Sequence, residues 1–311
     1  MVTLLIFVRR DTPLERWLDV KTLFLSILLE AVPFVLLGVF FSALIQTFVT
    51  DEQIRRWTPK HPLVALPFAS LLGFLFPVCE CAIIPIVRRL IHKGMPPSVG
   101  VTFLLAGPIV NPVVMAATYT AFIKQPEMVV YRSVLALVTA LLVGAFVLFF
   151  FRNRVLRYGA EETSAHSSRG SSGIFAVFSH AVDEFFDMGK YLIFGALVSS
   201  ILQVFLSRDT LSALGQTPLA SHLVMMGLGY IFSLCSEADA FIAASFGNTF
   251  STSSLLAFLV FGPMIDLKNT LMLLGSFRFA FVAALIAVTT VIVLVLSLVC
   301  GIWLDPHTLY R

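Results

Sequence analysis

Eight long apolar runs follow one another along this chain, and they constrain its fold more than any other feature of the sequence. Each run approaches the ~20 residues that an α-helix needs to cross a bilayer. Charged residues make up only 13% of the chain, against about 25% in soluble globular proteins. The sequence therefore predicts an all-α, polytopic membrane protein with about eight transmembrane helices, near residues 20–48, 63–90, 98–122, 130–151, 180–206, 219–245, 254–275 and 279–304.

A polar stretch divides these runs into two sets of four. Residues 152–178 begin with several arginines and are rich in Ser, Gly and Glu, so they cannot bury enough apolar surface to pack. We expect a first membrane repeat at 1–151, a cytoplasmic polar linker at 152–178 and a second membrane repeat at 179–311. If there are eight crossings, the basic residues place both termini in the cytoplasm, beneath a bacterial inner membrane. They include Arg16, Lys21, Arg88, Arg89 and Lys93.

The two sets resemble each other in three separate stretches. EAVPFVLLGVFFSALIQTF from Glu30 lies over DMGKYLIFGALVSSILQVF from Asp187. GFLFPVCECA lies over GYIFSLCSEADA, and GPIVNP lies over GPMIDL. The sequence thus predicts two homologous four-helix halves. Their relative direction stays open, because four full crossings per half make the copies parallel, whereas a re-entrant hairpin in each half leaves three crossings and inverts them. The matched pairs include Gly38 with Gly195, Cys79 with Cys235, and Asn111 with Asp266.

Each half carries two positions where a helix is expected to break. In the first half, Pro77 and Pro85 bracket two thiols and a carboxylate, and proline kinks or interrupts a helix. The second break is the motif Gly-Pro-x-x-Asn in one half and Gly-Pro-x-x-Asp in the other. Irregular backbone inside a membrane is tolerated only where it is buried in protein or lines a cavity. Paired broken helices therefore predict a binding site where the two halves meet, as in many transporters.

The side chains at these breaks supply the chemistry of the predicted site. An ionisable group within a bilayer is costly, so it indicates function by default. Thiols prefer soft metals, and Cys79, Cys81 and Cys235 are the candidate ligands, although the first two diverge by about 200° on a regular helix. The alternative is that the cysteines are packing residues and that the carboxylates pair with Lys268. The predicted substrate-binding residues are Pro77, Cys79, Glu80, Cys81, Pro108, Asn111, Pro112, Cys235, Glu237, Asp239, Pro263 and Asp266.

Other functional classes find little support in the sequence. It contains no P-loop, no GxSxG motif, no Rossmann glycine pattern and no HExxH motif. We therefore expect neither enzymatic activity nor a cofactor. The net charge of +3 is too small to indicate a nucleic-acid partner.

The stretch FPVCECAIIPIVRRLIHKGMPPSVGVTFLLAGPIVNP, residues 76–112, resembles the signature of a family of predicted permeases. That family includes the ArsP-type organoarsenical efflux permeases and the YraQ-type proteins. The stretch SLCSEADAFIAASF and the later GPMID are similar to its second conserved region. The resemblance implies an eight-span permease of the inner membrane that uses Cys79, Cys81 and Cys235. Arsenical exporters tend to have a small residue between the paired cysteines, so Glu80 favours the other branch.

Together these features predict a permease that moves a small solute by alternating access, driven by an ion or proton gradient. The solute would be a thiophilic metal, a metalloid or an organoarsenical. Two alternatives remain: a membrane thiol-disulfide redox protein that uses Cys79 and Cys81, and a scaffold subunit of an export complex that does not itself transport. The lipid bilayer and the solute are the predicted partners, and a homo-oligomer or a partner subunit stays open.

Overall fold

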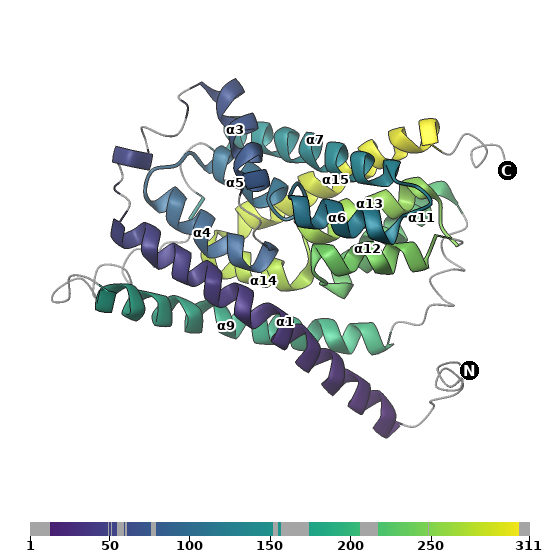
Figure 1. Ribbon diagram of the computed structural model, residues 1–311, viewed down its shortest axis with the longest axis horizontal. Coiled ribbons are helices and arrows are strands. Elements are labelled where there is room, and N and C mark those ends of the chain that lie inside the picture. Colours follow the sequence, from purple (N-terminus) through teal and green to yellow (C-terminus); the bar gives the residue numbers. More distant parts are fainter. Residues whose placement is uncertain are drawn as a thin grey trace.

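The computed structural model describes residues 13–48, 50, 52–54, 59, 61–75, 79–151, 155–156, 174–205, 217–247 and 249–304. Within them the chain forms twelve helices, which confirms the all-α prediction (Figure 1). The helices are α1 (Pro13–Phe48), α3 (Pro62–Leu75), α4 (Glu80–His92), α5 (Pro97–Ala106), α6 (Pro112–Ala121), α7 (Glu127–Phe150), α9 (Ile174–Phe205), α11 (Pro218–Phe232), α12 (Ser236–Ser245), α13 (Thr252–Met264), α14 (Leu267–Ser276) and α15 (Phe279–Leu304).

The helices follow the same order of lengths twice. A long helix is followed by four short helices and then by another long helix, first from α1 to α7 and then from α9 to α15. Proline begins several of them, including α5, α6 and α11. The first residue of a helix has no intrahelical partner for its N–H, so proline costs nothing there. The helix α9 begins at Ile174, inside the stretch that we expected to be linker.

The predicted breaks are present in the described residues. The helices α4 and α12 begin directly after Cys79 and Cys235, and α6 and α14 begin directly after Asn111 and Asp266. The discontinuous helices were therefore predicted correctly. Of the two prolines that were expected to break the chain near Cys79, Pro77 lies outside the described residues, and Pro85 lies inside α4, which continues through it to His92.

Two pairs of short helices turn back instead of continuing across the molecule. Both α3 and α4 pack against α5, and both α11 and α12 pack against α13. Figure 1 shows α3 and α4 toward one end of the long axis and α11 and α12 toward the other end. We call α3–α4 the first hairpin and α11–α12 the second hairpin. Each arm has 10 to 15 residues, which at 1.5 Å per residue is about 15–23 Å and falls short of a ~30 Å hydrocarbon core.

Among the described residues, five segments are long and apolar enough to cross a membrane, which is fewer than the eight crossings expected from the sequence. They are residues 16–46, 127–150, 181–204, 252–276 and 279–303. The difference arises because an apolar run of about 25 residues has the same composition whether it crosses once or turns back halfway. In the most apolar stretch of segment 252–276, 89% of the residues are buried, whereas in the corresponding stretches of the other four 28–39% are buried. The broken helix α13–α14 is therefore the interior element around which the rest of the fold packs.

Candidate functional site

Glu80 joins three elements at the centre of the molecule. It is the first residue of α4, and only 2% of its surface is exposed. Its Oε1 lies 3.3 Å from Nζ of Lys268, in the first turn of α14. Its Oε2 accepts a hydrogen bond of 3.2 Å from Oγ of Ser236, the first residue of α12. The tip of the first hairpin thus contacts both the second hairpin and the broken helix of the other half.

Lys268 is the cation that holds this junction together. Its Nζ lies 3.7 Å from Oδ2 of Asp266 and donates to the carbonyl of Ser233 at 3.1 Å. Ser233 ends α11 with a φ of 48°, and it is the only non-glycine residue with positive φ among the described residues. This left-handed conformation costs about 1–2 kcal/mol, and it directs the carbonyl of Ser233 toward the ammonium group. The second hairpin therefore also contacts Lys268 through its backbone.

Asp266 and Asn111 have the same structural role in the two halves. Asp266 Oδ1 accepts from the N–H of Asn269 and caps α14, while Asn111 Oδ1 accepts from the N–H of Val114 at 2.9 Å and caps α6. A side-chain cap satisfies one of the donors left free at a helix start. The amide of Asn111 also donates to the carbonyls of Gly107 and Pro108. Asn111 is thus fully engaged in stabilising its break.

Arg132 is a buried cation that the sequence analysis missed. It is 1% exposed, and it lies in α7. Its Nη2 donates to the carbonyl of Ser236 at 2.9 Å, its Nε to the carbonyl of Leu259, and its Nη1 to Oγ1 of Thr118. It therefore fastens α7 and α6 to α12 and α13. The signal was present, but Arg132 lies two residues from the start of an apolar run, where basic residues usually mark the membrane surface.

Asp239 completes what we call the buried charge network, which consists of Glu80, Lys268, Asp266, Arg132 and Asp239. Asp239 is 1% exposed, and its Oδ2 has no hydrogen-bond partner among the described residues. Of the two buried cations, Arg132 acts on it more strongly than Lys268. Three carboxylates and two cations leave one net negative charge when all five are ionised. Glu237, by contrast, is only half-buried at the start of α12.

The thiols lie at the edge of this network. Cys79 and Cys81 influence each other electrostatically, and the charge of Lys268 also acts on Cys81. Cys235 lies within the electrostatic influence of Glu80 and Glu30. All four cysteines are free thiols. In the part of the chain that is described, no three or more His, Cys, Asp or Glu side chains are arranged to hold a metal ion, so the three-thiol metal site stays a prediction.

The predicted prolines are placed differently from one another. Pro108 and Pro263 are buried beside the two Gly-Pro breaks, and Pro263 lies inside the last turns of α13. Pro112 is exposed at the start of α6. The prolines shape the breaks, whereas the polar contacts at the junction come from Glu80, Lys268 and Ser236.

A second group of polar contacts ties the far end of the first hairpin to the long helices. Arg89 Nη2 lies 3.3 Å from Oε2 of Glu184 in α9, and the same oxygen accepts a hydrogen bond of 2.8 Å from Oγ of Ser42 in α1. This contact joins α4, α1 and α9. It fastens this end of α4 to both long helices.

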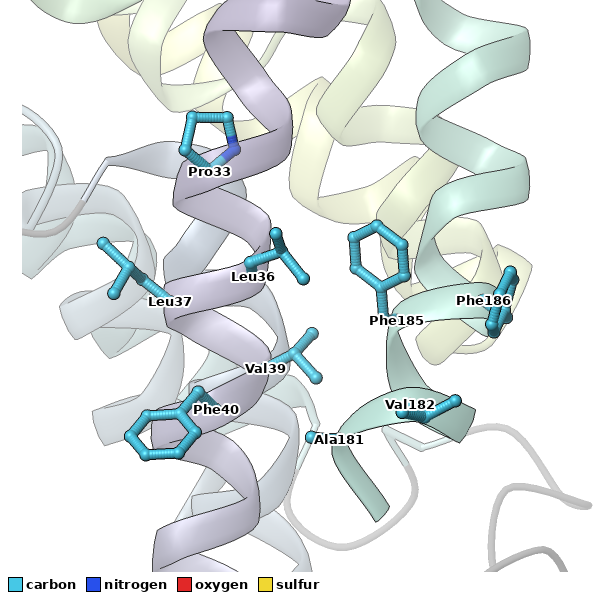
Figure 2. A pocket seen from close by; sticks show the side chains of 9 residues that line it. All are labelled: Pro33, Leu36, Leu37, Val39, Phe40, Ala181, Val182, Phe185 and Phe186. Carbon is cyan, nitrogen blue, oxygen red and sulfur yellow. The ribbon is translucent and has the colours of Figure 1, made fainter. Parts of the chain in front are cut away.

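An apolar groove of about 620 Å³ lies between α1 and α9 and is separate from the charge network (Figure 2). Pro33, Leu36 and Phe40 line it from α1, and Phe185 and Phe186 line it from α9. In Figure 2 Leu36 and Phe185 face each other across the groove. None of the predicted site residues lines it. Its walls lack charged groups, so it does not suit a charged solute.

Comparison with known proteins places this architecture in a family. Residues 16–302 match the ArsP_1 family model, described as predicted permease. The UPF0718 protein YcgR of Bacillus subtilis is 47% identical over 289 residues, which cover 92% of this chain and 98% of that protein. A Streptococcus mutans protein, named as a candidate two-component membrane permease complex subunit, is 36% identical over 92% of this chain and 96% of its own length. No solved structure matches the chain. The chain belongs to the predicted permease family.

Proposed function

We propose that this protein is a permease whose solute pathway passes through the junction of the two hairpin tips. The observation that carries the proposal is the buried contact of Glu80 with Lys268 and Ser236, which brings both halves of the chain to one point. Charges are kept inside a membrane protein at considerable cost, and they usually mark a substrate or ion pathway. The membership in a permease family supports the same function.

We further propose that the two halves are inverted copies of one unit. Three observations support this. The hairpins lie at opposite ends of the long axis in Figure 1. The hairpin arm α4 packs against α14 of the other half, and the corresponding arm α12 packs against α6. Two matched glycine pairs also make the same close approach: a Cβ on Gly73 would lie 2.8 Å from Gly107, and one on Gly229 would lie 3.2 Å from Gly262.

Inverted copies require an odd number of crossings in each half. If residues 97–121 of α5 and α6 cross together, as α13 and α14 do, each half has three crossings and one re-entrant hairpin. This is the second of the two arrangements that the sequence left open.

Lys93 donates to the carbonyl of Gln46 at the end of α1, so it lies a full helix length from Lys21. The basic residues that the sequence grouped on one side thus lie at opposite ends of α1, and the cytoplasmic location of the termini remains a proposal.

Alternating access follows from this arrangement. Each hairpin occupies one end of the molecule, and the two tips meet at Glu80 and Ser236. Movement of one hairpin away from its broken helix would open the junction toward one side only, while the other hairpin keeps it closed.

We propose that the solute is small and thiophilic, because Cys79, Cys81 and Cys235 lie beside the junction and thiolates bind soft metals and metalloids.

The test is transport by the purified protein in proteoliposomes, with Zn²⁺ and a trivalent methylated arsenical as probes. We expect uptake by the wild type, and a loss of at least tenfold in the Cys79→Ser and Glu80→Gln variants. Cys300→Ser is the matched control, because Cys300 is a half-buried thiol in α15. If both site variants transport the probes as fast as the wild type, the site is wrong. A wild type that moves neither probe contradicts the thiophilic solute.

A partner subunit is the second component of the proposal. The name of the Streptococcus mutans relative describes a subunit of a two-component membrane complex. Co-purification of this chain from native membranes in mild detergent should therefore recover a second membrane protein in fixed stoichiometry. Recovery of this chain alone contradicts the partner subunit, whereas transport by the purified chain in liposomes contradicts only the scaffold alternative.

A further inference from the structure

Asp239 occupies a place that an isoleucine fills in the other half. The shift of 156 residues that pairs Cys79 with Cys235 pairs Ile83 with Asp239. A Cβ on Gly107 would lie 2.6 Å from Cδ1 of Ile83, and a Cβ on the matching Gly262 would lie 3.3 Å from Oδ2 of Asp239. The two side chains thus sit at equivalent places, each against the glycine of a Gly-Pro break. Asp239 thus has a carboxylate at a position where, in the other half, the alkyl side chain of Ile83 is sufficient for packing.

The surroundings of Asp239 provide no hydrogen bond for Oδ2. The helix α12 packs mainly against α6 and α13, and neither of these helices contains a charged residue. The charges that act on Asp239 come from Arg132 in α7, from Lys268 in α14 and Asp266 directly before it, from Glu80 at the start of α4, and from Glu237 in its own helix. An unpaired anion in such a dry place is costly unless a proton neutralises it.

Arg132 is close to Asp239 but does not bind it in this conformation. All three hydrogen bonds that its guanidinium makes go to neutral oxygens, on Ser236, Leu259 and Thr118. No carboxylate oxygen of the described residues lies within 4 Å of it. A guanidinium has five N–H donors, so Arg132 keeps donors with which it can bind a carboxylate if the two elements shift.

We propose that Asp239 is the proton carrier of the permease: it is protonated while it lies against Gly262, and it releases the proton when a movement of α12 pairs it with Arg132. This inference rests on the proposed permease function and names the residue that couples a proton gradient to it. Glu80 is the less suitable carrier because it already has Lys268 and Ser236 as partners. A neutral Asp239 leaves Glu80 and Asp266 opposite Lys268 and Arg132, so the network is then balanced.

The experiment is infrared difference spectroscopy on the purified wild-type protein in lipid nanodiscs, in H₂O and D₂O, without any solute. We expect a carbonyl stretching band of a protonated carboxyl group at neutral pH that shifts in D₂O and disappears as the pH is raised. The band should be absent from Asp239→Asn. The same titration, followed by a pH indicator, should release one proton fewer per chain from Asp239→Asn than from the wild type.

Two further variants keep the test decisive. Asp187→Asn removes a partly exposed carboxylate outside the network, and it should leave the band unchanged. Asp239→Ile installs the side chain that the first half uses, so it should fold with a melting temperature at least equal to that of the wild type. It also lacks the band.

Two results would overturn the proposal. One is a band that persists in Asp239→Asn. The other is a band that depends on Asp239 but does not titrate over the pH range in which the protein stays folded, because a fixed acid carries no proton. Neither measurement uses a solute. Failure of the proton carrier is therefore distinguishable from failure of the permease, which the transport of Zn²⁺ and the arsenical tests separately.

Discussion

The helices α4 and α12 begin with the same backbone geometry but with different chemistry. Each has a cysteine in an extended conformation at its N-cap, Cys79 and Cys235, and the next two residues are Glu80-Cys81 in the first hairpin and Ser236-Glu237 in the second. Both thiols at the N-cap positions make no side-chain capping bond. The first tip provides the buried anion, whereas the second provides a hydroxyl that binds this anion at 3.2 Å.

This difference teaches how one interior can contain an ion pair at the point where two halves of similar sequence meet. Two glutamates at matched positions would face each other as like charges, and two serines would leave Lys268 with Asp266 alone. One glutamate and one serine give a single ion pair that is hydrogen-bonded on both sides. The asymmetry continues at the next turn, where Ile83 matches Asp239. The order of the helices is similar in both halves, but at each of these two matched positions only one half has the charged side chain.

The largest effect is expected from Lys268→Met. It leaves Glu80 and Asp266 buried without their cation, and an uncompensated buried charge costs about 3–5 kcal/mol. We expect a marked fall in melting temperature in detergent, or no folded protein. The double variant Lys268→Met with Glu80→Gln should recover part of the loss. If the double variant is less stable than the single variant, the ion pair is not the reason for the loss.

A smaller effect is expected from the matched glycines of α1 and α9. A Cβ on Gly38 would lie 2.5 Å from the backbone of Ala82 in α4, and one on Gly195 would lie 2.9 Å from Cα of Lys268 in α14. Overpacking of this kind costs about 1–3 kcal/mol, so Gly38→Ala and Gly195→Ala should lower the melting temperature.

The control for this pair is Gly189→Ala, where nothing lies within 4 Å of the added carbon. It should be neutral or stabilising by up to about 1 kcal/mol because alanine favours helix. Equal melting temperatures for all three alanine variants would show that the two helices do not approach α4 and α14 as closely as described.

The two helix caps should respond unequally when they are exchanged. Asn111→Asp keeps the oxygen that accepts from the N–H of Val114 but loses an amide that donates to the carbonyls of Gly107 and Pro108, so it should cost about 1–3 kcal/mol. Asp266→Asn keeps an oxygen for the N–H of Asn269, but it also removes one of the two buried anions beside Lys268, so its cost should exceed that of a cap exchange alone. Thermal unfolding of both variants measures the difference. Equal costs would mean that Asp266 acts only as a cap and not as a partner of Lys268.

The smallest effect is expected at the surface. Asp187 pairs with Lys190 at 2.7 Å, but both side chains are about half exposed. Exposed pairs at this spacing contribute about 0–0.5 kcal/mol. Asp187→Ala should therefore change the melting temperature little, and any residual effect should vanish at high salt. A large loss of stability would indicate that Asp187 belongs with the buried charges after all.

The sequence predicted the helical class and the positions of the breaks, because proline and the capping residues act through their immediate neighbours. Cys79, Asn111, Cys235 and Asp266 each precede a helix start. It left open whether each half contains a re-entrant hairpin, since hydropathy along an apolar run carries no information on whether the chain turns back. It also missed Arg132, because its hydrogen bonds go to residues more than 100 positions away as well as to Thr118.

The short pairing of Leu156 with Phe277 joins the end of the first half to the turn between α14 and α15. The N–H of Arg278 also donates to the carbonyl of Val155 at 3.1 Å. This backbone clasp is non-covalent, and it fixes the exit of one half beside the element that bears Lys268. If the gene is split at a codon between 157 and 173, one side of this pairing lies on the N-terminal fragment and the other side on the C-terminal fragment. Two such fragments, made together, would therefore keep a contact that aligns them.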